Sequence, residues 1–224
     1  MRSPLRAFLV LALVVVSCGS LTSATPSPSP SVVKSSSAQP ASASPASGPG
    51  RSLSAAEAQR LVGARVAATL DALKRHDGAA LAALAHPTKG VRFTPYPFVA
   101  TARDVVLMRA DLTNAYADTK TRTWGVSDGK GDPITLTFSD YNARYVYSRD
   151  FVNASKTSYN KPIGSGNSID NSADVYPNAV LFEAYDPGPD PAAESFRWQS
   201  LRLLFEPDGG TWYLVGIVHG EWTI

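Results

Sequence analysis

The stretch Trp212-Tyr213-Leu214-Val215-Gly216-Ile217-Val218-His219 is the strongest fold signal in the chain. It follows residues 196–205 after Glu206-Pro207-Asp208-Gly209-Gly210, and this order predicts two strands joined as a β-hairpin. Simple alternation places Tyr213, Val215, Ile217 and His219 on one face of the second strand, and Trp212, Leu214, Gly216 and Val218 on the other. Because both faces are largely apolar, we expect a central strand that is covered on both sides.

Helices are predicted at the start of the same domain. Ser54 and Glu57 have the spacing of a capping box, and an apolar stripe with helical periodicity follows at Val62, Val66, Leu70 and Leu73. A second, short helix is expected over residues 79–85, ending before Pro87. Further strands are expected at 91–94, 122–126, 134–137 and 179–185, a helix at 138–151 and a long polar loop at 153–178. Residues 104–117 fit a strand at 105–107 or a helix capped by Asp111.

This order of elements predicts an α+β domain, with N-terminal helices packed on a curved antiparallel sheet. The element order and the closing strand at 212–218 resemble the NTF2-like cone, in which helices and a curved sheet enclose a pocket. The resemblance covers about residues 53–224. It implies a pocket but no particular activity, because such folds carry isomerases, dehydratases and binding modules. Residues 86–93, 198–203 and 212–224 also resemble uncharacterised bacterial lipoproteins and secreted proteins.

The N-terminus carries an export signal. Arg2 and Arg6 flank the start of an apolar run over residues 7–16, and Ser17 and Cys18 follow. Val15-Val16-Ser17-Cys18 resembles the lipobox of bacterial lipoproteins, which implies that Cys18 is lipidated and becomes the first mature residue. The run is shorter than the roughly 20 residues of a membrane-spanning helix. An uncleaved helix and an ordinary signal peptide are the alternatives to a signal peptide at 1–17 and a lipid anchor at Cys18.

These features predict a three-part chain. Residues 18–52 are rich in Ser, Pro and Ala and predict a disordered tether, followed by a single globular domain at 53–224. We expect an exported protein anchored to the outer face of the cytoplasmic membrane, or to an outer membrane where the host has one. Four of the 21 basic residues, Arg2, Arg6, Lys34 and Arg51, precede Leu53, which leaves the domain 17 basic against 19 acidic residues. That balance argues against a nucleic-acid partner.

Cys18 is the single cysteine, so a lipidated chain has no thiol for a disulfide, a metal site or nucleophilic catalysis. No metal-binding motif is recognisable, and we expect no metal and no cofactor. The candidate catalytic pair is His219 and Glu221, which alternation places on one strand face, where a histidine beside a carboxylate can act as a general acid or base. A hydrogen-bonded histidine at the sheet edge is the structural alternative.

Aromatic and arginine residues supply candidates for a ligand pocket. The rings can contact a carbohydrate or an apolar ligand, and the guanidinium groups can bind an anionic group. The candidates are Trp124, Tyr141, Arg144, Tyr145, Trp198 and Arg202. The same residues are equally typical of a core beneath a sheet. The sequence favours a cell-envelope lipoprotein that binds a small ligand or an envelope component over catalysis. The alternatives are a small isomerase-, dehydratase- or hydrolase-like pocket enzyme using His219, and a protein-interaction domain.

Overall fold

The computed structural model describes residues 49–164, 166–189 and 194–223. The fold described below belongs to the unit Ala43–Ile224. Cys18, the predicted signal peptide and most of the predicted tether lie outside the described residues. Among the helices of the described part, none is long and apolar enough to cross a membrane.

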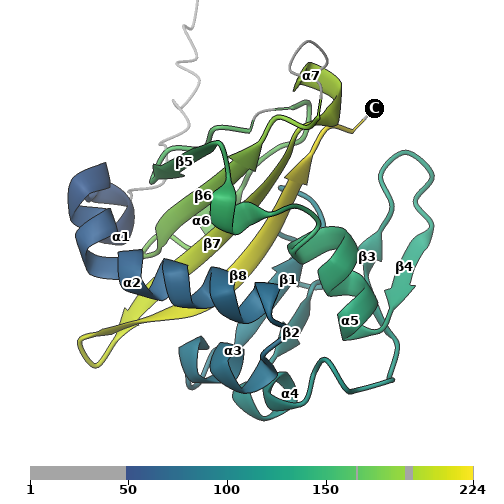
Figure 1. Cartoon of the computed structure of the whole chain (residues 1–224), viewed down its shortest axis with the longest axis horizontal. Coiled ribbons are helices and arrows are strands. Elements are labelled where there is room, and N and C mark those ends of the chain that lie inside the picture. The colour runs from purple at the N-terminus through teal and green to yellow at the C-terminus, as the bar shows by residue number, and fades with distance from the viewer. Residues whose placement is uncertain (1–48, 165, 190–193, 224) are drawn as a thin grey trace, which may run out of the picture. The chain divides into compact units, whose positions relative to one another are not determined.

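A curved sheet organises the domain (Figure 1). Its strand order is β2-β1-β8-β7-β6-β5, and every neighbouring pair is antiparallel except β1 and β8. The strands are β1 (Val91–Thr94), β2 (Val105–Leu107), β5 (Lys156–Tyr159), β6 (Val180–Asp186), β7 (Gln199–Asp208) and β8 (Thr211–Glu221). A separate two-stranded ribbon is formed by β3 (Arg122–Val126) and β4 (Pro133–Leu136).

The predicted hairpin is present and its second strand is central. β8 lies between β1 and β7, as the two apolar faces predicted. Gly209 and Gly210 have positive φ angles of 56° and 81°, the conformation that a tight two-residue hairpin turn requires. β7 begins at Gln199 rather than at residue 196, because a helical turn, α7 (Glu194–Arg197), precedes it.

A β-bulge makes the predicted face alternation of the last strand wrong. Leu204 pairs with Gly216 and Phe205 pairs with Leu214, so Val215 is an extra residue in β8. Beyond the bulge, the side chains of β8 point to the opposite face from the one that simple alternation predicts. Leu214 and Ile217 therefore both enter the main core, whereas Val215 and Val218 lie in a smaller cluster.

The N-terminal helices form as the sequence predicts. Helix α2 (Ala55–Lys74) begins at Ser54, whose side chain and that of Glu57 form the reciprocal capping box. Its predicted apolar stripe is buried in the main core, and α3 (Gly78–Leu84) follows with Asp77 as its N-cap. A further turn, α1 (Pro49–Ser52), is held by Asn160, whose Nδ2 donates to the carbonyls of Gly50 at 2.8 Å and Leu53 at 3.0 Å. Residues 49–52 are therefore joined to the segment after β5 by hydrogen bonds.

The middle of the chain differs from the prediction in three places. Residues 104–117 contain both alternatives in succession, β2 and then α4 (Arg109–Thr113). The helix expected over 138–151 is shorter: α5 (Phe138–Tyr141) continues as a π-helical turn (Asn142–Val146), and a 3-10 turn (Phe151–Asn153) follows separately. The expected loop at 153–178 contains β5 and α6 (Ser172–Val175). β5 is polar because it is an edge strand with one paired side.

The two apolar clusters lie on the two faces of the sheet. The main cluster joins α2, α3 and the α5 region to β1, β6, β7 and β8. The second contains Leu181, Leu204, Val215 and Val218, with Val175 and Tyr176 packed against it. The predicted α+β class, with helices on a curved and mainly antiparallel sheet, is confirmed.

Candidate functional site

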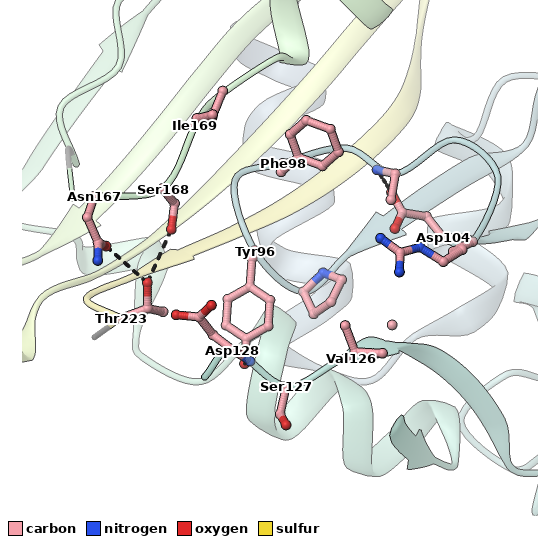
Figure 2. Close-up of a pocket in the computed structure, with 14 residues that line it drawn as sticks. Tyr96, Phe98, Asp104, Val126, Ser127, Asp128, Asn167, Ser168, Ile169 and Thr223 are labelled. Carbon is pink, nitrogen blue, oxygen red and sulfur yellow. Dashed lines mark hydrogen bonds between the residues drawn. The ribbon is translucent and has the colours of Figure 1, made fainter. Parts of the chain in front are cut away.

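A cavity of about 410 Å³, named the principal cavity, lies between four segments of the domain. Figure 2 shows its walls, which come from the segment after β1, the end of β3, the loop before α6 and the C-terminal tail. Its lining is Pro95, Tyr96, Phe98, Ala100, Arg103, Asp104, Gly125, Val126, Ser127, Asp128, Asn167, Ser168, Ile169 and Thr223. Four segments far apart in the sequence therefore build one site.

Three large apolar side chains at this cavity are exposed. Phe98, Val126 and Ile169 expose 49%, 40% and 73% of their surface. They belong to three different segments, and Figure 2 shows Phe98 and Ile169 on neighbouring loops. Exposed apolar groups that gather around a concavity are typical of a binding site, whereas single ones are ordinary. The cavity therefore offers an apolar surface to a ligand.

Asp104 is the most unusual polar group in the lining. Its Oδ2 accepts hydrogen bonds from the Thr94 hydroxyl at 2.9 Å and the Ala100 backbone N–H at 2.8 Å. Burial raises the pKa of the Asp104 carboxyl, and these two hydrogen bonds and the charges of Arg92 and Arg103 oppose the rise only in part. Within the described part of the chain, its Oδ1 has no hydrogen-bond partner and the carboxyl has no salt bridge. One oxygen is fixed by the fold and the other is free to bind.

The remaining polar lining is held by hydrogen bonds between segments. The backbone N–H of Asp128 donates to the Tyr96 hydroxyl at 3.2 Å, which joins the β3 end to the segment after β1. Thr223 lies 3.2 Å from the Ser168 hydroxyl and donates to Asn167 Oδ1, also at 3.2 Å, as the dashed lines in Figure 2 show. These contacts fix the lining before any ligand arrives, which lowers the entropy cost of binding.

A two-way contact also joins the loops on either side of the cavity. Asn171 Oδ1 accepts from the Val99 N–H at 2.7 Å, and Asn171 Nδ2 donates to the Val99 carbonyl at 3.0 Å. An asparagine side chain that pairs with both backbone groups of one residue mimics a strand partner. This pair therefore sets the separation of Phe98 and Ile169.

The predicted catalytic pair is brought together outside the lining of the principal cavity, with His219 buried and Glu221 at a second recess. His219 Nε2 and Glu221 Oε2 are 3.3 Å apart, an ion-pair distance, but the geometry is not that of a hydrogen bond. Neither ring nitrogen of His219 has a hydrogen-bond partner among the described residues, and the ring is completely buried. Burial lowers the pKa of His219, and the Glu221 carboxylate opposes this only in part. The His219 imidazole is therefore neutral and has no exposed surface.

Glu221 is bonded to one cationic side chain and one amide side chain. Arg144 forms two hydrogen bonds with its carboxylate, at 3.1 and 2.8 Å, and Gln199 Nε2 donates at 3.1 Å. Burial alone would raise the pKa of Glu221, but His219 and Arg144 outweigh it and lower that pKa to about 2. Arg144 also lies over the Tyr145 ring, 4.4 Å from its centroid. Arg144 is thus already paired with a carboxylate.

The other predicted pocket residues lie in two separate places. Trp124 and Tyr141 stack in the main core with ring centroids 4.1 Å apart, and Tyr141 stacks in turn on Tyr145 at 5.3 Å. Trp198 lines a second recess of about 370 Å³ with Glu221 and Trp222. None of the predicted residues lines the principal cavity. Their contact with a ligand stays a prediction.

Arg202 lies in a buried ion-pair network. Its Nε and Nη1 donate to Glu183 at 3.0 Å and Asp170 at 2.9 Å, and its Nη2 donates to the Gly164 carbonyl at 2.6 Å. Glu183 also accepts from the backbone N–H groups of Ile163 and Gly164. Arg202 is 2% exposed and Glu183 is fully buried. The network joins the sheet to the loop that carries Asn167, Ser168 and Ile169 into the cavity wall.

Sequence reasoning missed the residues of the principal cavity. Tyr96 and Phe98 follow the predicted strand at 91–94, and no sequence pattern marks them as site residues. Asp104 begins the segment at 104–117, which fits a strand or a helix. Residues 127–133 have the composition of a turn between the strands predicted at 122–126 and 134–137. A weak signal was the length of the polar segment at 153–178, because long loops are often functional.

Comparison with known proteins adds little. No protein-family model matches the chain, and no curated protein matches it. Its structure is similar to that of a designed NTF2-like protein at 12% sequence identity, over 71% of this chain and 97% of that one, with a TM-score of 0.28. A likeness of this size carries no argument about function.

Proposed function

We propose that the chain is a membrane-anchored cell-envelope lipoprotein whose domain binds a small ligand in the principal cavity. The observation that carries the binding proposal is one site that combines an apolar rim, Phe98, Val126 and Ile169, with a half-buried carboxyl, Asp104, that has a free oxygen. Binding sites typically combine such apolar surface with a few fixed polar groups. We also propose an NTF2-like arrangement for the helices and sheet.

Anchoring is proposed from the lipobox-like residues at 15–18. Lipid anchoring is physically reasonable, since each buried CH₂ group contributes about 0.8 kcal/mol and two chains hold a protein firmly. The test is radiolabelled palmitate in cells that express the chain or its Cys18→Ala variant. We expect label and membrane association for the natural chain and neither for the variant. Label that persists in Cys18→Ala would overturn the proposal.

The acid–base alternative with His219 is less well supported. A general base must come within hydrogen-bond reach of its substrate. His219 has no exposed surface, and the aromatic ring of Tyr145 lies at 5.8 Å from it. A substrate would have to open the core to reach this ring. The cavity is open to a ligand without such a change.

Native mass spectrometry of the full chain purified gently from its own host tests ligand binding. We expect an extra non-covalent mass that disappears on denaturation. Val126→Trp fills the cavity and should abolish it. Val152→Trp is the matched control, because Val152 is also an exposed valine, at 45%, but lies outside the cavity lining. A bare mass for the natural chain, or an extra mass in all three proteins, would count against the proposal and favour a protein partner or another site.

A further inference from the structure

The charges around the cavity decide which ligands it can hold. Asp104, Asp128 and Arg103 are the ionisable acidic and basic groups in its lining. Asp128 and Arg103 are exposed, so water screens them, whereas Asp104 is half-buried. The charge that a bound ligand meets most strongly is therefore the Asp104 carboxylate.

Arg92, whose charge acts on Asp104, forms no ion pair with its carboxylate within the described residues. Arg92 donates from Nε to the Tyr176 hydroxyl at 3.1 Å. Its Nη1 donates to the backbone carbonyls of Thr101 at 3.1 Å and Asp104 at 3.4 Å. These bonds position the loop, and no contact within the described residues joins Arg92 to the carboxylate oxygens. A half-buried carboxylate without an ion pair loses part of its hydration, and a cationic ligand would offset that cost.

The groups next to Asp104 favour the same class of ligand. Tyr96 and Phe98 present aromatic rings in the lining, and aromatic faces attract organic cations by about 0.5–2 kcal/mol. Val126 and Ile169 add exposed aliphatic surface for an apolar body. An anionic ligand would instead be repelled by both Asp104 and Asp128. Arg103 is the one cationic side chain among the described lining residues.

We propose that the principal cavity binds an amphipathic organic cation, with its ammonium group at Asp104 and its apolar body against Phe98, Val126 and Ile169. This inference rests on the proposed function and names the class of ligand for that cavity. The free Oδ1 of Asp104 is the acceptor for the ammonium protons.

The test is calorimetric titration of the full chain with three probes of similar shape: 2-phenylethylammonium, neutral 2-phenylethanol and anionic phenylacetate. We expect the cation to bind most tightly and the anion most weakly. Asp104→Asn should weaken binding of the cation about tenfold or more, and leave that of the alcohol unchanged. The variant should fold, because the asparagine oxygen can still accept from Thr94 and Ala100.

Two further variants remove charges of opposite sign from the lining and serve as controls. Arg103→Gln should tighten binding of the cation a few-fold, since it removes the one lining cation. Asp128→Asn should weaken it less than Asp104→Asn, because Asp128 is exposed. Alcohol or phenylacetate binding as tightly as the cation, or an unchanged cation affinity in Asp104→Asn, would overturn the inference.

The outcomes also separate this inference from the proposed function. If the co-purified ligand is neutral or anionic and is lost in Val126→Trp, the cavity binds a ligand but the proposed class is wrong. If none of the three probes binds and no mass co-purifies, both proposals fail. If the cation binds equally well to Val126→Trp, it occupies another site, and the inference fails.

Discussion

Replacing Arg202 with Met should destabilise the domain strongly. The side chain is 2% exposed and its removal leaves the fully buried Glu183 carboxylate without its cation. Breaking a buried ion pair in this way costs about 3–5 kcal/mol. The second partner, Asp170, is 26% exposed and adds less. For a domain of this size, about 2–4 °C is lost per kcal/mol, so Arg202→Met should lower Tm by roughly 6–20 °C.

Urea denaturation followed by tryptophan fluorescence measures this loss. Arg75→Met is the matched control, because Arg75 pairs with Asp71 at 2.8 Å on the surface, where both side chains are more than half exposed. That variant should lose at most about 1 kcal/mol. Glu183→Gln combined with Arg202→Met removes the stranded charge, and should recover about 1–3 kcal/mol relative to the sum of the single variants. A loss for Arg202→Met as small as that for Arg75→Met would refute the reasoning.

Three further changes test other parts of the fold. His219→Leu should keep stability within about 1 kcal/mol at pH 7, because the buried ring nitrogens make no hydrogen bond. Burial lowers the folded-state pKa of His219 below its ordinary value of 6.5. Below that pH the unfolded chain therefore binds more protons than the folded one, and the stability of the natural chain should fall on acidification. Glu221, with its pKa lowered from 4.5 to about 2, loses its stabilisation between those values. Urea midpoints across pH should show a weaker decline below pH 6.5 in His219→Leu, and an unchanged decline would contradict the assignment. Gly90→Ala should cost about 2 kcal/mol or more by thermal denaturation, because φ is +64° and the new Cβ would lie 2.5 Å from the Leu107 carbonyl oxygen. Ser54→Ala should cost about 0.5–2 kcal/mol through loss of the α2 cap, and an unchanged Tm would contradict this.

The sequence was sufficient where local chemistry decides the structure. The start of α2 follows from the reciprocal bonds of Ser54 and Glu57, and its buried face follows from the spacing of Val62 and Val66. The hairpin follows from Gly209 and Gly210, whose positive φ angles suit a tight turn. These signals involve residues close together in the chain.

The bulge at Val215 could not be predicted because the strand is apolar on both faces. Alternation identifies a face only when one side is polar. Here either register buries apolar side chains, and only the pairing with β7 decides that Leu214 and Ile217 share a cluster. Simple alternation therefore assigned Leu214 and Ile217 to opposite faces of β8, although both belong to the main cluster.

The cavity was missed because its residues are unremarkable in their local sequence. Aromatic residues were predicted to line a pocket, but Trp124 and Tyr141 stack in the core, and the same residue types serve both roles. Phe98, Asp104 and Ile169 become neighbours of one cavity only through the sheet and the Asn171 contact with Val99. Tertiary contacts over such distances leave no periodic pattern in the chain.

Binding of the ligand in the principal cavity is tested most directly by backbone amide NMR shifts. Titration of the full chain with 2-phenylethylammonium should shift the amides of Ser127, Ser168 and Ile169, which line the cavity, in a saturable way. The amide of Val152, exposed but outside the lining, should stay unchanged. Saturable shifts centred instead on Trp198 and Trp222 of the second recess, or on His219 in the core, would contradict the assignment of the site.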